Sequence, residues 1–147
     1  MDRKYIFDFD STLTRVEALD ILAEITLKNR PDRKEIIREI QHITNLGIDG
    51  DISFTESLER RIRMLDATRK DLPVLIEELR KKISKSIATN REFFEKHASQ
   101  IYVISAGFME FIVPIVKEYN IPEDRVFANT FEFDAEGNII GFDAENV

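Results

Sequence analysis

The chain has 147 residues, of which 43% are hydrophobic and 33% are charged, and its formal net charge is −7. This length suits one domain, or one domain with a small insertion. The acidic balance argues against a nucleic-acid partner, which needs a basic face, but it leaves a small anionic ligand open. The chain has no cysteine, which excludes a disulfide framework, a CxxC zinc site and a thiol nucleophile. Without a signal peptide or an apolar run of roughly 20 residues, we expect a soluble, cytoplasmic protein with no membrane partner.

The first half of the chain is predicted to contain one strand and then a block of helices. Tyr5–Phe7 is a short apolar run typical of a buried strand. Apolar residues then recur at helical spacing between Val16 and Leu27 and again after Pro31. The two glycines between Leu46 and Asp51 predict a loop. Ser53, with Glu56 three residues later, is typical of a helix-capping box.

Further helix starts are predicted at Asp71 with Pro73 and at Thr89, where Glu92 completes a second capping-box pattern. The pattern then changes to strands. Two strands are predicted at 101–104 and 126–128, and a hairpin is predicted from 130–133 and 139–142. One helix is predicted between the two strands. The helix is expected over residues 108–119, with Pro114 as a complication inside it. This order predicts an α/β core with a helical insertion after the first strand.

Two carboxylates directly follow the first predicted strand, in the run DFDST from Asp8 to Thr12. Ligands of open α/β sheets bind beyond the carboxyl ends of the strands. Neighbouring carboxylates repel each other unless a divalent cation or a shared proton relieves the repulsion. One carboxylate could attack phosphorus and the other could transfer protons. The alternative is a simple turn in which these residues cap the next helix.

The chain resembles phosphatases of the haloacid dehalogenase superfamily. DFDST is similar to their first motif, and the run VISAGF from Val103 to Phe108 is similar to their second. The resemblance implies that Asp8 is the nucleophile, that Asp10 is the general acid and base, and that both serve a Mg²⁺ site. It also implies that Ser105, Ala106 and Gly107 bind the phosphoryl oxygens. Ser105 alone would more often be a helix cap.

The helical block resembles the cap domain of the phosphoserine phosphatases within this superfamily. Glu17 matches the acidic residue that reads the substrate amine, Arg61 matches the arginine that binds the substrate carboxylate, and Phe54 matches a pocket wall. A guanidinium suits a carboxylate because two parallel hydrogen bonds can form. Each residue also has a structural alternative: a surface glutamate, a solvated arginine beside Arg60, and a core phenylalanine.

The resemblance implies an incomplete Rossmann-like core, residues 1–13 and 88–147, with a helical-bundle cap at 14–87 and a hairpin near the C-terminus. Ala106 replaces the usual glycine of the second motif, and Met109 stands where some members have arginine. The later motifs of the family, a lysine and an acidic pair, have no counterpart. Lys117, Asp143 and Glu145 lie in unsuitable positions. We therefore expect these residues to be the N-terminal part of a longer polypeptide.

The resemblance implies Mg²⁺-dependent hydrolysis of a phosphomonoester, with phospho-L-serine as the leading substrate and serine biosynthesis as the setting. Two alternatives stay open. The chain could be a non-catalytic segment that binds phosphoserine or another anion, or a related capped phosphatase acting on another small ester. An incomplete core would expose apolar surface and a sheet edge, so we also expect either a homodimer or a chain prone to aggregation.

Overall fold

The computed structural model describes residues 2–146. Their parallel sheet consists of β1 (Tyr5–Phe7), β2 (Ile101–Phe108) and β3 (Val126–Asn129), in the order β1-β2-β3. Phe7 pairs with Val103, and Val103 pairs with Val126. The three strands predicted from the sequence are confirmed, although β2 continues four residues beyond its predicted end. Because the strands are parallel, their carboxyl ends lie at one edge of the sheet.

One face of the sheet is covered and the other is open. The covering helices are α6 (Arg91–His97) and α7 (Met109–Val116). Phe7 packs on Phe94 of α6 with ring centroids 5.4 Å apart. On the opposite face Ile6, Ile104 and Phe127 are 65%, 50% and 55% exposed. Parallel sheets are normally covered on both faces, so this face is unusual. The predicted homodimer stays a prediction.

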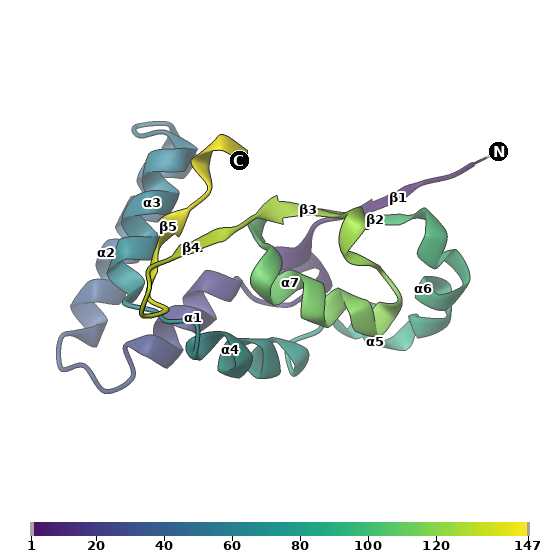
Figure 1. Cartoon of the computed structure of the whole chain (residues 1–147), viewed down its shortest axis with the longest axis horizontal. Coiled ribbons are helices and arrows are strands. Elements are labelled where there is room, and N and C mark those ends of the chain that lie inside the picture. The colour runs from purple at the N-terminus through teal and green to yellow at the C-terminus, as the bar shows by residue number, and fades with distance from the viewer. Residues whose placement is uncertain (1, 147) are drawn as a thin grey trace.

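Five helices lie between β1 and α6. They are α1 (Ala18–Thr26), α2 (Arg33–Asp49), α3 (Phe54–Leu65), α4 (Asp71–Arg80) and α5 (Lys85–Thr89). Helices α2 and α3 stand side by side at one end of the molecule, away from α6 (Figure 1). Leu58 and Ile62 of α3 are fully buried in the common core. The predicted cap at Ser53 is confirmed, because its hydroxyl oxygen accepts a 3.0 Å hydrogen bond from the Glu56 N–H.

The predicted loop from Leu46 to Asp51 is wrong. Helix α2 continues to Asp49 and ends only at Gly50, whose φ of +80° is the left-handed conformation that favours glycine. Gly47 is helical because it faces α3 closely: a Cβ there would lie 2.8 Å from the Cβ of Ser57. This glycine therefore marks a close helix–helix contact rather than a loop.

The second predicted capping box is also wrong. The Thr89 hydroxyl donates to the carbonyl oxygen of Lys85 within α5, and α6 begins at Arg91 after Asn90. The predicted helix at 108–119 is shorter in the structure. It contains α7, with Pro114 in its interior, and then a single tighter turn at Lys117–Tyr119.

The predicted hairpin is present as β4 (Phe131–Phe133) and β5 (Ile139–Phe142), which are antiparallel. It lies beside α3 (Figure 1) and is hydrogen-bonded to the loop between α3 and α4. The Ile139 N–H donates to the Ala67 carbonyl oxygen (2.9 Å), and the Arg69 N–H donates to that of Gly137 (2.8 Å). The C-terminal hairpin therefore contacts the helical insertion as well as following the sheet.

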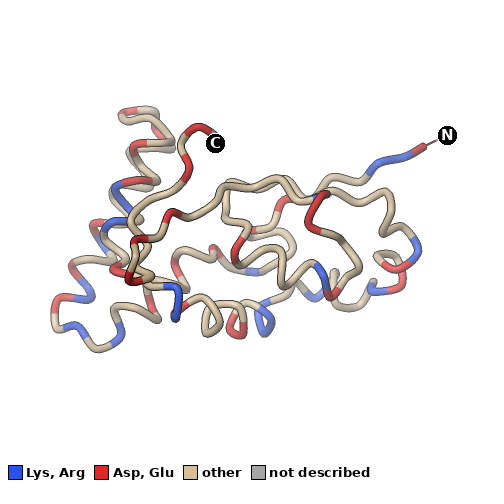
Figure 2. The backbone as a smooth tube through the Cα atoms, in the orientation of Figure 1, with Lys and Arg blue, Asp and Glu red and all other residues tan. Residues whose placement is uncertain are grey.

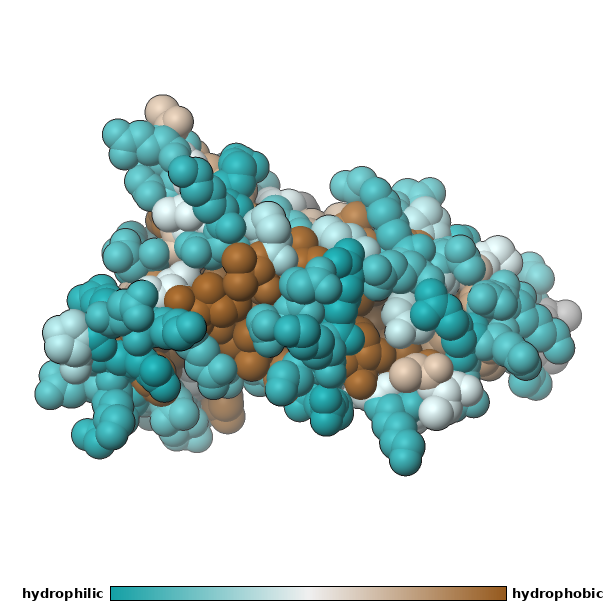
Figure 3. Space-filling model, turned by 90° about the horizontal axis from the view of Figure 1, so that it is seen from below, coloured by the Kyte–Doolittle hydropathy of each residue, from teal (hydrophilic) through white to brown (hydrophobic). Residues whose placement is uncertain are grey.

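The surface mixes both charges. Basic and acidic residues alternate along the exposed helices, and no basic stripe is visible in this view (Figure 2). Seen from the side on which α4 lies, hydrophobic surface is interrupted by hydrophilic side chains (Figure 3). No helix within residues 2–146 is both long and apolar enough to cross a bilayer.

Candidate active site

The loop after β1 holds Asp8 and Asp10 in different surroundings. Phe9 between them is fully buried and packs on Phe111, which anchors the loop to the core. Ser11 adopts a positive φ of 56°, which turns the chain back toward α1. Asp8 is exposed, and its Oδ1 accepts a 2.6 Å hydrogen bond from the Phe9 N–H. The loop therefore points Asp10 inward and leaves Asp8 at the surface.

Asp10 is half-buried and bonded to the start of α1. Its Oδ1 accepts a 2.7 Å hydrogen bond from the N–H of Ala18, the first residue of that helix. The pKa of Asp10 is raised to about 6, mainly by burial; the Ala18 hydrogen bond opposes the rise, and the charges of Glu17 and Asp8 contribute to it. A carboxyl group with this pKa can both donate and accept a proton near neutral pH.

The end of β2 approaches Asp10 closely. The Gly107 N–H donates to the Ser105 hydroxyl oxygen (2.9 Å). A Cβ on Gly107 would lie 2.9 Å from Oδ2 of Asp10 and 3.1 Å from Oγ of Ser105. Only a residue without a side chain fits between these two oxygens. Ala106 is exposed, and its carbonyl oxygen accepts a hydrogen bond from the side chain of Asn129 (3.0 Å).

A cavity of about 320 Å³ joins this region to the helical insertion. Its charged lining residues are Asp10, Glu17, Asp20 and Arg61, and its other lining residues are Leu19, Thr44, Ile48, Phe54, Leu58, Ala106 and Gly107. Six of the eight site residues predicted from the sequence therefore line one cavity. Asp8 and Ser105 do not line it, and Ser105 faces a separate hollow beside β3.

Glu17, Asp20 and Arg61 bring further charges into the cavity. Glu17 precedes α1, and its Oε1 accepts a 2.7 Å hydrogen bond from the Ser11 hydroxyl. Arg61 lies on α3, and its Nε donates to the Ser57 carbonyl oxygen (3.3 Å). Burial lowers the pKa of Arg61, while the carboxylates of Asp20 and then Glu17 counteract that effect. The cavity therefore offers both a cation and anions to a ligand.

Sequence reasoning missed Asp20, although a signal for it was present. Asp20 lies three residues after Glu17, and residues at that spacing share one face of a helix. Its pKa is raised by burial and by the charge of Glu17, and lowered by Arg61. The pairing of α1 with α3, which brings Asp20 into the cavity with Arg61, has no signal in the sequence.

Asp8 and Asp10 are the residues that could hold a divalent cation. Among the residues that the structure describes, no group of three or more His, Cys, Asp or Glu side chains could do so. Mg²⁺, however, is usually held by one or two carboxylates together with substrate phosphate and water. The oxygen donors of Asp8 and Asp10 fit that requirement.

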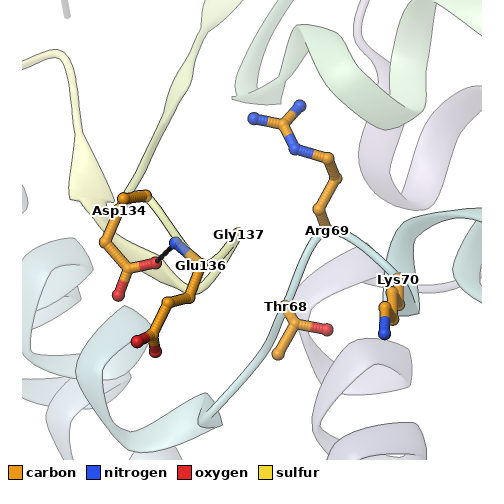
Figure 4. A pocket seen from close by; sticks show the side chains of 7 residues that line it. Thr68, Arg69, Lys70, Asp134, Glu136 and Gly137 are labelled. Atoms are coloured by element: carbon orange, nitrogen blue, oxygen red, sulfur yellow. Dashed lines mark hydrogen bonds between the residues drawn. The ribbon is translucent and has the colours of Figure 1, made fainter.

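A larger cavity, of about 470 Å³, lies away from this site. It is formed by the α3–α4 loop (Thr68–Lys70) and by the turn of the hairpin (Asp134–Gly137) (Figure 4). The Arg69 guanidinium lies 3.8 Å from the centre of the Phe133 ring, and Asp134 accepts hydrogen bonds from the N–H groups of Glu136 and Asn138. Arg69 therefore stabilises the junction, and Asp134 stabilises the hairpin turn.

Comparisons with known proteins agree with this arrangement. The chain is 30% identical over 137 residues to phosphoserine phosphatase of Drosophila melanogaster and 28% identical to that of Homo sapiens. These matches cover 93% of this chain but 48% and 57% of the two relatives, so the chain spans about half their length. A phosphoserine phosphohydrolase-like protein from Francisella tularensis superposes with a TM-score of 0.80 at 30% identity, covering 98% of this chain and 66% of that one.

A structure described as a phospho-aspartyl intermediate analogue of phosphoserine phosphatase has the same fold, with a TM-score of 0.70 at 24% identity, over 96% of this chain and 62% of that one. The family of haloacid dehalogenase-like hydrolases matches residues 5–146, which is nearly the whole chain. The chain therefore belongs to the haloacid dehalogenase-like hydrolase family.

Proposed function

We propose that this chain carries the nucleophile and the amino-acid-binding residues of a phosphomonoester hydrolase that acts on phospho-L-serine. The observation that supports this most directly is the cavity that Asp10 and Gly107 share with Glu17 and Arg61. The cavity lining contains a carboxyl group suited to proton transfer, next to Gly107, and the opposite charges that an amino acid requires.

The binding mode follows from charge complementarity. The Arg61 guanidinium would form two parallel hydrogen bonds with the substrate carboxylate. Oε1 of Glu17 accepts from the Ser11 hydroxyl, and the second carboxylate oxygen of Glu17 would accept a hydrogen bond from the substrate ammonium. Phe54, which is 44% exposed, would cover the carbon chain. These contacts would place the phosphate near Ser105, Ala106 and Gly107.

The chemical steps use the two aspartates in turn. An oxygen of Asp8 would form a bond to phosphorus while the ester P–O bond breaks, and Asp10 would give its proton to the departing serine oxygen. A water molecule would then attack the aspartyl-phosphate and lose a proton to Asp10. The P–O bond to Asp8 would break, releasing phosphate and restoring both carboxyl groups.

Mg²⁺, held by Asp8 and Asp10 together with the phosphate, would supply positive charge that offsets the phosphoryl oxygens. Asp8 lies outside the cavity, so these steps need the helical insertion and the core loop to approach each other. We propose that residues 14–87 form a cap that closes over the substrate and excludes water. The cytoplasmic location and the place in serine biosynthesis stay predictions.

The test is to trap the covalent intermediate. The chain is mixed with phospho-L-serine and Mg²⁺, quenched in acid, digested and analysed by mass spectrometry. The expected result is one phosphoryl group on the peptide that contains Asp8, and none in Asp8→Asn. A phosphoryl group on another residue, or phosphate release from unlabelled protein, would contradict the proposed mechanism.

A second candidate is a binding module that does not turn phosphoserine over. The exposed position of Asp8 outside the cavity favours this candidate. Calorimetry distinguishes the two. Saturable binding of phospho-L-serine, without any labelling of Asp8, would favour the module. A third candidate is a related phosphatase for another small ester. It is favoured by Ala106, which lines the cavity and replaces the usual glycine, and by Met109, which stands where some members of the family have arginine.

A further inference from the structure

The Arg61 guanidinium is only partly engaged by the protein. Its Nε donates to Ser57, and no carboxylate oxygen of the described residues lies within 4.0 Å of it. A half-buried guanidinium needs a counter-charge, because the loss of water disfavours its charged form. The two carboxylates that share its cavity are Glu17 and Asp20.

The carboxylates of Glu17 and Asp20 differ in their hydrogen bonding. Glu17 is held by the Ser11 hydroxyl. Asp20 accepts no hydrogen bond from any residue between 2 and 146, so its charge is not shared with another donor. Consistent with this, Asp20 contributes more than Glu17 to keeping the pKa of Arg61 high. Asp20 is therefore the main electrostatic partner of Arg61.

We propose that Asp20 is a positioning residue that holds the Arg61 guanidinium in the cavity, with its terminal nitrogens free, and thereby selects substrates that carry a carboxylate. This inference rests on the proposed function. It follows from three placements: Asp20 in the first turn of α1, Arg61 on α3, and both in the wall of one cavity.

The separation of the two side chains is what makes this role possible. A bidentate ion pair would occupy the guanidinium, and an arriving carboxylate would have to break that pair. An attraction across more than 4.0 Å orients Arg61 without using its hydrogen-bonding positions. When the substrate carboxylate binds Arg61, its ammonium can lie near Glu17, so the local charges balance.

The first arm of the test needs no substrate. Hydrogen exchange at Nε of Arg61, which donates to Ser57, is measured by NMR in the wild-type chain, in Asp20→Asn and in Glu24→Gln. Glu24 is a matched control: it lies one turn further along α1, and it lines a neighbouring hollow with Asp20 rather than the cavity with Arg61. We expect exchange to accelerate severalfold in Asp20→Asn only. Unchanged exchange in that variant would overturn the proposal.

The second arm separates positioning from direct contact with the amine. Binding of phospho-L-serine, of phosphoethanolamine and of the desamino analogue 3-phosphonooxypropanoate is measured by calorimetry. Asp20→Asn should weaken the two carboxylate-bearing ligands by about tenfold, as expected for a misplaced binding group, and phosphoethanolamine by less than about twofold. In an Arg61→Ala background the same substitution should have no further effect. Asp20→Glu should restore part of the loss.

The outcomes are separate from those of the proposed function. A loss confined to the two ligands that carry an amine, and persisting in Arg61→Ala, would show that Asp20 reads the amine and would overturn the positioning role. A wild-type chain that binds none of the three ligands would contradict the proposed function, while the exchange measurement would still decide whether Asp20 holds Arg61.

Discussion

The backbone N–H of Ala18 donates a 2.7 Å hydrogen bond to Oδ1 of Asp10, which joins the loop after β1 to the first turn of α1. The bond fixes one carboxylate oxygen and directs the other, Oδ2, toward Gly107. It also links the loop that follows the sheet to the helical insertion, at a residue that lines the cavity. Movement of the insertion would therefore be coupled to the position of the proposed acid and base.

The Asp10→Asn variant should be more stable than wild type at pH 7.5. The pKa of Asp10 is raised in the folded state to about 6 from an ordinary value of 3.8, so the folded state binds this proton more tightly. The contribution of protonated Asp10 to the free energy of unfolding is therefore fully present below about pH 4, and it is lost as the pH rises through about 6.

The expected gain in the free energy of unfolding is on the order of 2–3 kcal/mol at pH 7.5, and it should shrink as the pH falls toward 4. Urea denaturation at several pH values measures it. A gain that grew toward acid pH would contradict the assigned pKa.

The Gly107→Ala variant should lose phosphoserine turnover and binding. Its added methyl group would lie 2.9 Å from Oδ2 of Asp10, 3.1 Å from Oγ of Ser105 and 3.2 Å from Cζ of Phe111. Because these neighbours must move, we also expect a loss of about 1–3 kcal/mol of stability.

Gly141→Ala is the matched control, since its methyl group would meet only Glu132 Oε2 at an ordinary 3.7 Å. Denaturation and phosphate release are measured on both variants. Full activity in Gly107→Ala would show that the approach of β2 to Asp10 is unimportant.

The Gly47→Ala variant should destabilise the pair of helices α2 and α3. The new Cβ would lie 2.8 Å from both Cβ and Oγ of Ser57, which is buried and donates to the Ile43 carbonyl oxygen. We expect a loss of about 1–3 kcal/mol, despite the better helix propensity of alanine.

Asn45→Ala, at an exposed position of the same helix, should be neutral or slightly stabilising in the same denaturation experiment. If Gly47→Ala also proved neutral, the close contact between α2 and α3 would be wrong.

The Arg61→Ala variant should reduce turnover of phosphoserine far more than turnover of an aryl phosphate. The aryl ester has no carboxylate for the guanidinium to bind, so it loses little. The kcat/KM for phosphoserine should fall by roughly ten- to a hundredfold, the effect of removing a charged hydrogen-bond partner. Steady-state kinetics with both esters measures this. Equal losses would contradict the carboxylate-binding assignment.

Much of the fold was predictable because strong local patterns coincide with tertiary packing. The apolar run Tyr5–Phe7 and the run from Ile101 are parallel strands, and Ser53 caps its helix as its sequence pattern indicates. The errors arose where packing overrides a local pattern. Gly47 is helical because α3 lies against it, and Thr89 bonds within its own helix.

Most of the site residues predicted from sequence motifs line the cavity. Glu17, Phe54 and Arg61 are far from Gly107 in the sequence but line one cavity with it. The role of Asp20 depends on how α1 packs beside α3, and the exposed position of Asp8 depends on the loop conformation. Neither could be read from residue spacing alone.

The measurement that tests the account most directly is phosphate release from phospho-L-serine by the purified chain with Mg²⁺, beside Asp8→Asn as the control. The account predicts turnover by the wild-type chain and none by the control, since Asp8 is the only proposed nucleophile. Equal phosphate release by both would contradict the nucleophile assignment. No release by either would contradict catalysis by this chain and favour the binding module.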